Sequence, residues 1–175
     1  MTKSTLLETL GFALMYVIKS LLNLAFYFVT FVACGTVGLV LMVYFKQDSM
    51  LYHPVIGGDP KYRYPKNMPV GYRHPGEHGM EYIDLLIETK DKVALHAWFV
   101  KANPNPLLCR TLIFFHENAG NIGTRVPNIE ILVKQLNTNV LILAYRGYGD
   151  SEGTPSEEGL KLDAEATLEL SLIHI

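Results

Sequence analysis

Residues 111–123 read TLIFFHENAGNIG and join a short apolar run to a loop of small and polar residues. The run TLIFF is brief and almost continuously apolar, which is typical of a strand buried on both faces of a sheet. A second such run, VLILAY, occupies residues 140–145, and apolar residues recur at helical spacing from about Thr124. A strand, a helix and a strand with short joints predict a right-handed βαβ unit in a parallel sheet.

The segments on either side of this unit also carry strand and helix signals. In residues 80–88 and 93–100, apolar side chains alternate with polar ones, and the turn TKDK separates the two runs. This pattern predicts an antiparallel hairpin. Further along, Thr154 and Glu157 have the spacing of a capping box, so we predict that a helix begins at Pro155. The expected fold class is α/β.

The N-terminal part of the chain has a different composition. Residues 21–45 carry no charge and are bounded by Lys19 and Lys46. As a helix this run would measure roughly 37 Å at about 1.5 Å per residue, enough to cross a hydrocarbon core of about 30 Å. A signal peptide would be shorter. We therefore predict a single-pass transmembrane helix at residues 21–45, after an N-terminal segment, 1–20, whose apolar part either lengthens the helix or lies at the interface.

The charges and the composition limit the remaining possibilities. Lysines flank the apolar run too evenly to decide its orientation. Residues 46–79 are rich in Pro, Gly and Tyr, which predicts an extended, turn-rich linker. The net charge of -2 and the absence of a basic face argue against a nucleic-acid partner. The distant Cys34 and Cys109, and the absence of metal-ligand spacings, predict no disulfide, no metal and no cofactor.

The sequence GDSEG, residues 149–153, fits the G-x-S-x-G pattern of a serine nucleophile. That pattern requires a tight turn from a strand directly into a helix. Ser151 instead lies six residues beyond the predicted strand and four before Pro155. We interpret this loop as structural, although Ser151 as the nucleophile of a minimal enzyme stays an alternative. The loop residues in question are Tyr145, Arg146, Gly147, Tyr148, Gly149, Ser151 and Gly153.

The loop HENAGN, residues 116–121, follows the first buried strand at its C-terminal end, where ligands gather in open α/β sheets. Small residues at Ala119 and Gly120 allow backbone N–H groups to converge on a carbonyl oxygen that becomes negative during acyl transfer. The alternative is a sharp connection capped by Asn118 and Asn121. These residues alone leave both interpretations open.

Taken together, FFHENAGNIG and YRGYGDSEGTPSEEG resemble the α/β-hydrolase superfamily, in particular its membrane-anchored branch, over roughly His53 to Glu169. The resemblance implies that the Asn118 N–H belongs to an oxyanion hole and that His116 shapes the loop. Glu117 stands where the family usually has Gly, which places a carboxylate at the pocket mouth. The candidate oxyanion-hole loop consists of His116, Glu117, Asn118, Ala119, Gly120 and Asn121.

The same resemblance predicts that the chain is the N-terminal part of a longer protein. It implies that the nucleophile, the acid and the His of a catalytic triad lie beyond this stretch, so residues 80–169 would form the N-terminal half of a hydrolase domain without activity. The closing LSLIHI, residues 170–175, is similar to the translation of a transposase end sequence and is expected to be a non-native tail.

The resemblance also predicts what the complete protein does. It would be a membrane-anchored serine hydrolase with a cytoplasmic N-terminus, with the lipid bilayer and a small acyl or lipidated substrate as partners. The reaction would cleave esters, thioesters as in protein depalmitoylation, or amides. The alternative is a non-catalytic membrane adaptor with a pseudo-hydrolase domain.

Overall fold

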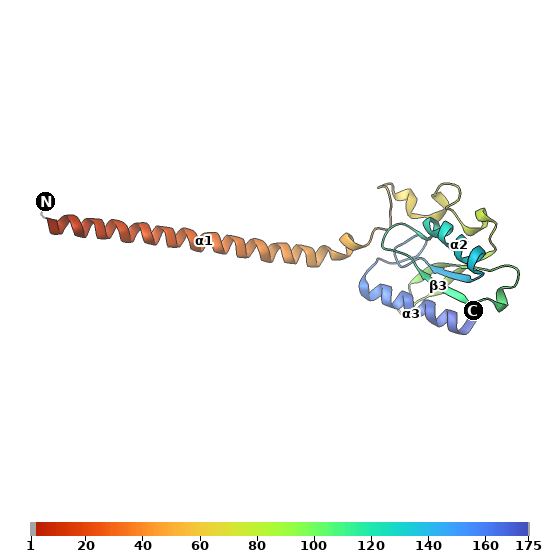
Figure 1. The fold of residues 1–175 in the computed structure, drawn as a ribbon. Coiled ribbons are helices and arrows are strands. Elements are labelled where there is room, and N and C mark those ends of the chain that lie inside the picture. Colours follow the sequence, from red (N-terminus) through yellow and green to blue (C-terminus); the bar gives the residue numbers. More distant parts are fainter. Residues whose placement is uncertain (1–2, 175) are drawn as a thin grey trace. The chain divides into compact units, whose positions relative to one another are not determined.

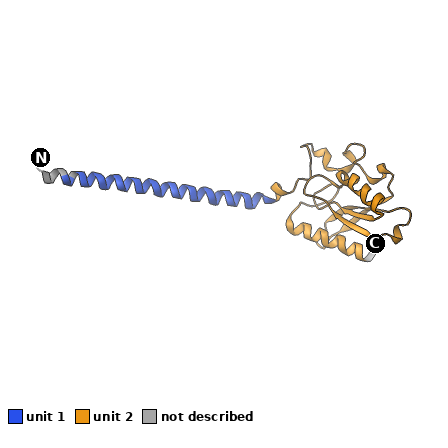
Figure 2. Cartoon of the chain, in the orientation of Figure 1, with its two compact units in different colours: residues 1–47 blue, residues 48–175 orange. Residues whose placement is uncertain are grey.

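The computed structural model describes residues 3–174 and divides into two compact units, residues 1–47 and 48–175 (Figure 2). The described residues of the first unit, 3–47, lie in helix α1, Lys3–Leu51, a single helix of 49 residues (Figure 1). Its residues 10–51 are long and apolar enough to cross a membrane. The apolar part of the N-terminal segment therefore lengthens the predicted transmembrane helix rather than forming a separate element.

Two threonine side chains in the middle of α1 form hydrogen bonds within the helix. The hydroxyl of Thr30 donates to the carbonyl of Phe26 at 2.9 Å, and that of Thr36 donates to the carbonyl of Val32 at 2.9 Å. Because hydrocarbon offers no hydrogen-bond partners, internal bonds of this kind are what a membrane-spanning helix requires.

The second unit contains a four-stranded sheet in the order β1-β2-β4-β3. Strands β1, Tyr82–Glu88, and β2, Ala94–Val100, form the predicted antiparallel hairpin. Strand β3, Thr111–Phe115, pairs in parallel with β4, Asn139–Leu143, and helix α2, Val126–Leu136, connects them. The predicted hairpin and βαβ unit are both confirmed.

Helices cover both faces of this sheet, which explains why every residue of β4 is buried (Figure 1). On one face, Trp98 and Ile142 belong to a cluster with Ile129 of α2. On the other face, Leu95 and Leu141 form a cluster with Ala166 of helix α3, Glu157–His174. Strand β4 therefore lies between two packed layers, as expected for an α/β fold.

Two local predictions, for the strand TLIFF and for the last helix, differ from the structure. TLIFF was expected to be buried on both faces, but β3 is an edge strand among the described strands, and Leu112 and Phe115 are 37% and 38% exposed. The last helix begins at Glu157 rather than Pro155, because the hydroxyl of Ser156 accepts from the N–H of Gly159 at 3.2 Å and so caps the helix.

Residues 46–79 do not form the extended linker that their composition predicts. Helix α1 continues to Leu51, and three short 3-10 helices follow, Pro60–Arg63, Pro65–Asn67 and Pro75–His78. Each begins at a proline, which suits the first position of a helical turn although it disfavours a long helix. Hydrogen bonds to the sheet loops make most of the segment part of the second unit.

Candidate oxyanion loop and neighbouring pocket

The loop of residues 116–121 follows β3 at its C-terminal end and leads into a 3-10 turn, Ile122–Arg125. Gly120 has φ +82°, and a Cβ there would lie 2.4 Å from Cδ1 of Ile56. The position therefore favours glycine for its backbone conformation, and a larger residue would also displace the Ile56 side chain. Asn121 caps the turn by accepting from the N–H of Gly123 at 2.8 Å, as one of the two interpretations predicted.

Asn118 does not cap the turn. Its side-chain Nδ2 donates to the carbonyl of Leu51 at 2.7 Å. Its backbone carbonyl accepts from the N–H of His53 at 2.8 Å and from the hydroxyl of Tyr148 at 2.7 Å. Across residues 3–174, the backbone N–H of Asn118 has no hydrogen-bond acceptor. The peptide is held in place while its N–H stays available.

His116 is buried beneath this loop. Its Nδ1 lies 2.7 Å from the carbonyl of Glu117, and its Nε2 lies 3.4 Å from the N–H of Tyr145. These contacts assign the proton to Nδ1, which donates, and leave Nε2 as the acceptor. Burial lowers the pKa of His116 to about 4, so the ring is neutral at pH 7. His116 therefore joins the loop to the start of the next one.

Glu117 points outward rather than across the loop. Its side chain is 64% exposed, and its carboxylate forms an ion pair with Arg125. Arg125 also donates through Nη2 to the carbonyl of Ala119 at 3.1 Å. The carboxylate that replaces the family's usual Gly thus has a cationic partner within the same loop.

Ser151 lies in the neighbouring loop and is only 2% exposed. Its hydroxyl donates to the carbonyl of Ala144 at 2.6 Å and accepts from the backbone N–H of His96 at 2.9 Å. The imidazole of His96 instead contacts Asp84 at 2.8 Å. A serine nucleophile needs an adjacent base and access to substrate, and this geometry offers neither to Ser151.

The same loop contains a buried ionic network that sequence reasoning missed. Arg146 donates through its backbone N–H and Nε to the two carboxylate oxygens of Asp163, at 2.9 and 2.8 Å. It also binds Asp91 of the hairpin turn, at 2.8 and 3.0 Å, and this hydrogen bonding lowers the pKa of Asp91. A Cβ at Gly159 would lie 2.4 Å from Cδ of Arg146. The sequence feature that could have revealed this network is Asp163, a carboxylate on the inner side of the helix predicted to begin at Pro155.

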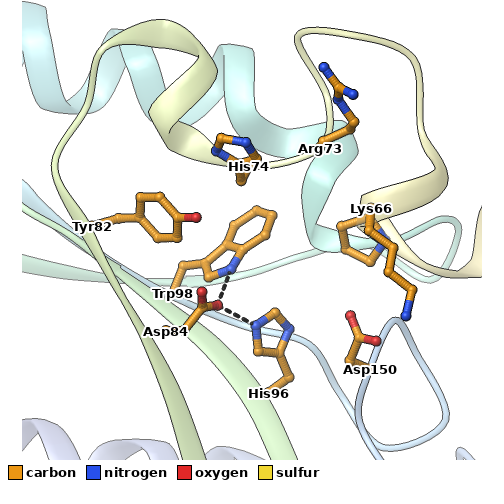
Figure 3. Close-up of a pocket in the computed structure, with 9 residues that line it drawn as sticks. Lys66, Arg73, His74, Tyr82, Asp84, His96, Trp98 and Asp150 are labelled. Carbon is orange, nitrogen blue, oxygen red and sulfur yellow. Dashed lines mark hydrogen bonds and ion pairs between the residues drawn. The ribbon is translucent and has the colours of Figure 1, made fainter.

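A separate cavity of about 420 Å³ lies beside the hairpin (Figure 3). At its base, Oδ1 of Asp84 accepts from Nε2 of His96 and Nε1 of Trp98, each at 2.8 Å. Sequence reasoning treated His96 as structural and did not weigh Asp84, although the hairpin register sets Asp84 opposite Trp98. The residues that line the cavity are Pro65, Lys66, Arg73, His74, Tyr82, Asp84, His96, Trp98 and Asp150.

This cavity and the candidate oxyanion loop are distinct features. None of residues 116–121 lines the cavity. Within residues 3–174, no group of three His, Cys, Asp or Glu side chains is placed to hold a metal ion.

Comparison with known proteins agrees with the fold. No protein-family model matches the chain. Alpha/beta hydrolase domain-containing protein WAV2 of Arabidopsis thaliana is 41% identical over 134 residues, which are 75% of this chain and 40% of that protein. An uncharacterized membrane protein of Saccharomyces cerevisiae, YNL320W, is 43% identical over 94 residues, 54% of this chain and 32% of that protein.

A solved structure supports the same assignment. The Pyrococcus furiosus esterase Pf2001 is 27% identical to this chain with a TM-score of 0.50, over 58% of this chain and 38% of the esterase. The chain spans 40% of the length of the Arabidopsis protein and 38% of the length of protein bem46 of Schizosaccharomyces pombe, to which it is 43% identical over 115 residues. On its strand order, its loops and these relatives, the chain belongs to the α/β-hydrolase superfamily.

Proposed function

We propose that this chain supplies the membrane anchor and the oxyanion-hole loop of a serine hydrolase that cleaves esters, thioesters or amides of acyl substrates. The observation that carries the proposal is the peptide of Asn118. Its carbonyl is held by two hydrogen bonds, and its N–H has no acceptor in the described part of the chain. A fixed, unpaired N–H is what stabilises an oxyanion without reorganisation during the reaction.

The neighbouring residues would support this role. Neutral His116 holds the start of the loop from below, and its low pKa keeps a positive charge out of the buried layer at pH 7. The Arg125–Glu117 ion pair closes the outer side of the loop. We propose that α1 crosses the membrane once with its N-terminus in the cytoplasm.

The attacking group would come from residues outside this chain. Ser151 is unsuitable because both hydrogen-bonding functions of its hydroxyl are used by the backbone. In a Ser-His-Asp triad, the serine would attack the acyl carbonyl and the histidine would take its proton, while Asn118 stabilises the oxygen. The 175-residue chain is then inactive by itself.

Two measurements test the proposal. Sequencing the transcript beyond codon 169 should reveal a G-x-S-x-G roughly thirty residues downstream, by the spacing of strand and elbow in this fold. A fluorophosphonate probe should label that longer product, and the labelling should disappear when the new serine is changed to alanine. Labelling of the present chain that is abolished by Ser151→Ala would contradict the assignment.

The alternative function is a non-catalytic membrane adaptor, and the observation that favours it is Glu117. Its carboxylate and Arg125 occupy the outer side of the loop that would receive the substrate. If the longer product resists the probe both as wild type and as Glu117→Gly, the adaptor becomes the better description. A gain of labelling in Glu117→Gly would instead support a hydrolase that Glu117 restrains.

A further inference from the structure

The cavity beside the hairpin contains a histidine whose ring is fixed on one side and unused on the other. Nε2 of His96 donates to Oδ1 of Asp84 at 2.8 Å, and the same oxygen accepts from Nε1 of Trp98. In the neutral imidazole this leaves Nδ1 as an acceptor. Nδ1 is buried and has no hydrogen-bond partner within residues 3–174, an arrangement that costs free energy until a donor arrives. The ring lies between the carboxyl groups of Asp84 and Asp150, with Nδ1 on the side of Asp150 (Figure 3).

The charged groups that line this cavity are not balanced. Arg73 is paired with Glu77, which is not a lining residue. The remaining lining charges are the carboxylates of Asp84 and Asp150 and the ammonium of Lys66. Within residues 3–174, neither carboxylate forms an ion pair with a lysine or an arginine. The lining therefore has one carboxylate more than it has cations to balance them.

Aromatic rings form another wall of the cavity. Tyr82 stacks against His74 with ring centroids 5.8 Å apart, and it meets the edge of Trp98 at 6.0 Å. This apolar surface suits a short alkyl chain. The volume of about 420 Å³ lies in the range of small-molecule sites, about 300–1,000 Å³.

The segment that covers the cavity is fastened to the rest of the domain. Arg73 and His74 precede the 3-10 turn that ends at His78. Nδ1 of His78 lies 2.6 Å from Glu130 of helix α2, and its Nε2 lies 2.9 Å from the carbonyl of Gly71. The cavity is therefore formed before any ligand enters, as is usual for small-molecule sites.

We propose that this cavity binds a small primary amine, with its ammonium group at the carboxylates of Asp84 and Asp150 and its alkyl chain against Tyr82. The ammonium supplies the missing positive charge and an N–H donor for Nδ1 of His96. A neutral alcohol lacks the charge, and a quaternary ammonium lacks the N–H. The inference does not depend on the proposed function, because none of residues 116–121 lines the cavity.

Trp98 provides a direct readout, because it is the single tryptophan of the chain and its indole N–H binds Asp84. The full chain is labelled with nitrogen-15 tryptophan and kept in a maltoside detergent, which carries no ammonium group. Butylammonium should shift the indole resonance to saturation, whereas butanol and tetramethylammonium should not. Absence of saturation with butylammonium, or equal saturation by either of the other two compounds, would overturn the proposal.

The contribution of the carboxylate is tested by Asp84→Asn, which keeps an acceptor for His96 and Trp98 but removes the charge. The Kd for butylammonium should rise at least about fivefold, the change for one net hydrogen bond. Glu88→Gln is the matched control, because Glu88 belongs to the same strand and is also 63% exposed but does not line the cavity. Equal Kd values in wild type and Asp84→Asn would refute the proposed seat of the ammonium.

A third variant, Lys66→Met, separates an external ligand from an internal one. Lys66 carries the like charge of the lining, so its removal should lower the Kd for butylammonium, by up to about fivefold for an exposed pair of charges. Saturation that occurs only in Lys66→Met would overturn the proposal, because the Lys66 ammonium would then occupy the site in the wild-type chain. A higher Kd in this variant would place the amine away from the carboxylates and would also refute it.

Discussion

The loops that follow β3 and β4 lie side by side, yet their polar groups are used in opposite ways. In the β4 loop, the Ser151 hydroxyl both donates to and accepts from the backbone, and the Arg146 guanidinium donates three hydrogen bonds to carboxylates. In the β3 loop, neighbouring segments hold the backbone, and the Asn118 N–H has no acceptor among the residues that the structure describes. Only the β4 loop matches the letters of a nucleophile motif, through GDSEG. The comparison separates a motif match from chemical availability, because the serine of the motif is engaged while the proposed oxyanion donor is not.

The largest effect should come from breaking the ionic network that holds the β4 loop. Arg146→Met leaves Asp163 buried without its cationic partner, which should reduce the free energy of unfolding by about 3–5 kcal/mol. Urea unfolding of the whole chain in detergent measures the change. Lys161→Met on the exposed side of α3 is the matched control and should change it by less than about 0.5 kcal/mol. A similar, small loss in both variants would contradict a structural role for Arg146.

The next effect concerns His116, the residue that joins the two loops. Its folded pKa of about 4 lies below its ordinary value of 6.5, so the unfolded chain binds the proton first. Its contribution to the free energy of unfolding is complete above pH 6.5. This contribution decreases by about 3 kcal/mol as the pH falls toward 4.

Denaturation midpoints across this pH range provide the measurement. His116→Gln can still donate and accept hydrogen bonds but does not titrate, so this part of the pH dependence should disappear in the variant. If wild type and variant lose stability in parallel between pH 6.5 and 4, another group is responsible.

A smaller loss is expected when the motif serine is removed. Ser151→Ala leaves the buried N–H of His96 and the carbonyl of Ala144 without their partner, at a cost of about 1–3 kcal/mol. Thr154→Ala, at an exposed position of the same loop, should have almost no effect. Equal stability of the two variants would indicate that the Ser151 hydroxyl is free for another purpose and would weaken the contrast between the loops.

The smallest effect should come from Tyr148→Phe, which changes only the contact between the two loops. The variant loses one hydrogen bond to the carbonyl of Asn118, worth about 1 kcal/mol. Hydrogen exchange should accelerate in the peptide of residues 117–121 and stay unchanged in α2. Tyr64→Phe serves as the matched control. Unchanged exchange in the β3 loop would show that the hydrogen bonds with Leu51 and His53 suffice to hold Asn118.

Several features were predictable because they depend on local patterns. Alternation of apolar residues predicted the β1–β2 hairpin, and two apolar runs separated by a helical pattern predicted the parallel pair β3–β4. Other features depend on partners that are distant in the sequence. Helix α3 is capped by Ser156, whose hydroxyl accepts from the N–H of Gly159. Residues 46–79 form hydrogen bonds with Gly149 and Asn121, and the composition of the segment does not reveal these partners.

The sequence by itself determined the apolar N-terminal helix, the α/β class and the loop that a family resemblance identifies, since each follows from composition or from short-range periodicity. Only the tertiary structure decided which polar groups are used. Ser151 and Asn118 each lie in a plausible motif, but the partners that engage one and orient the other come from 7 to 67 residues away. A donor or acceptor that is already in a hydrogen bond is not available to a substrate. Which polar groups of a loop can take part in chemistry is therefore known only once the chain has folded.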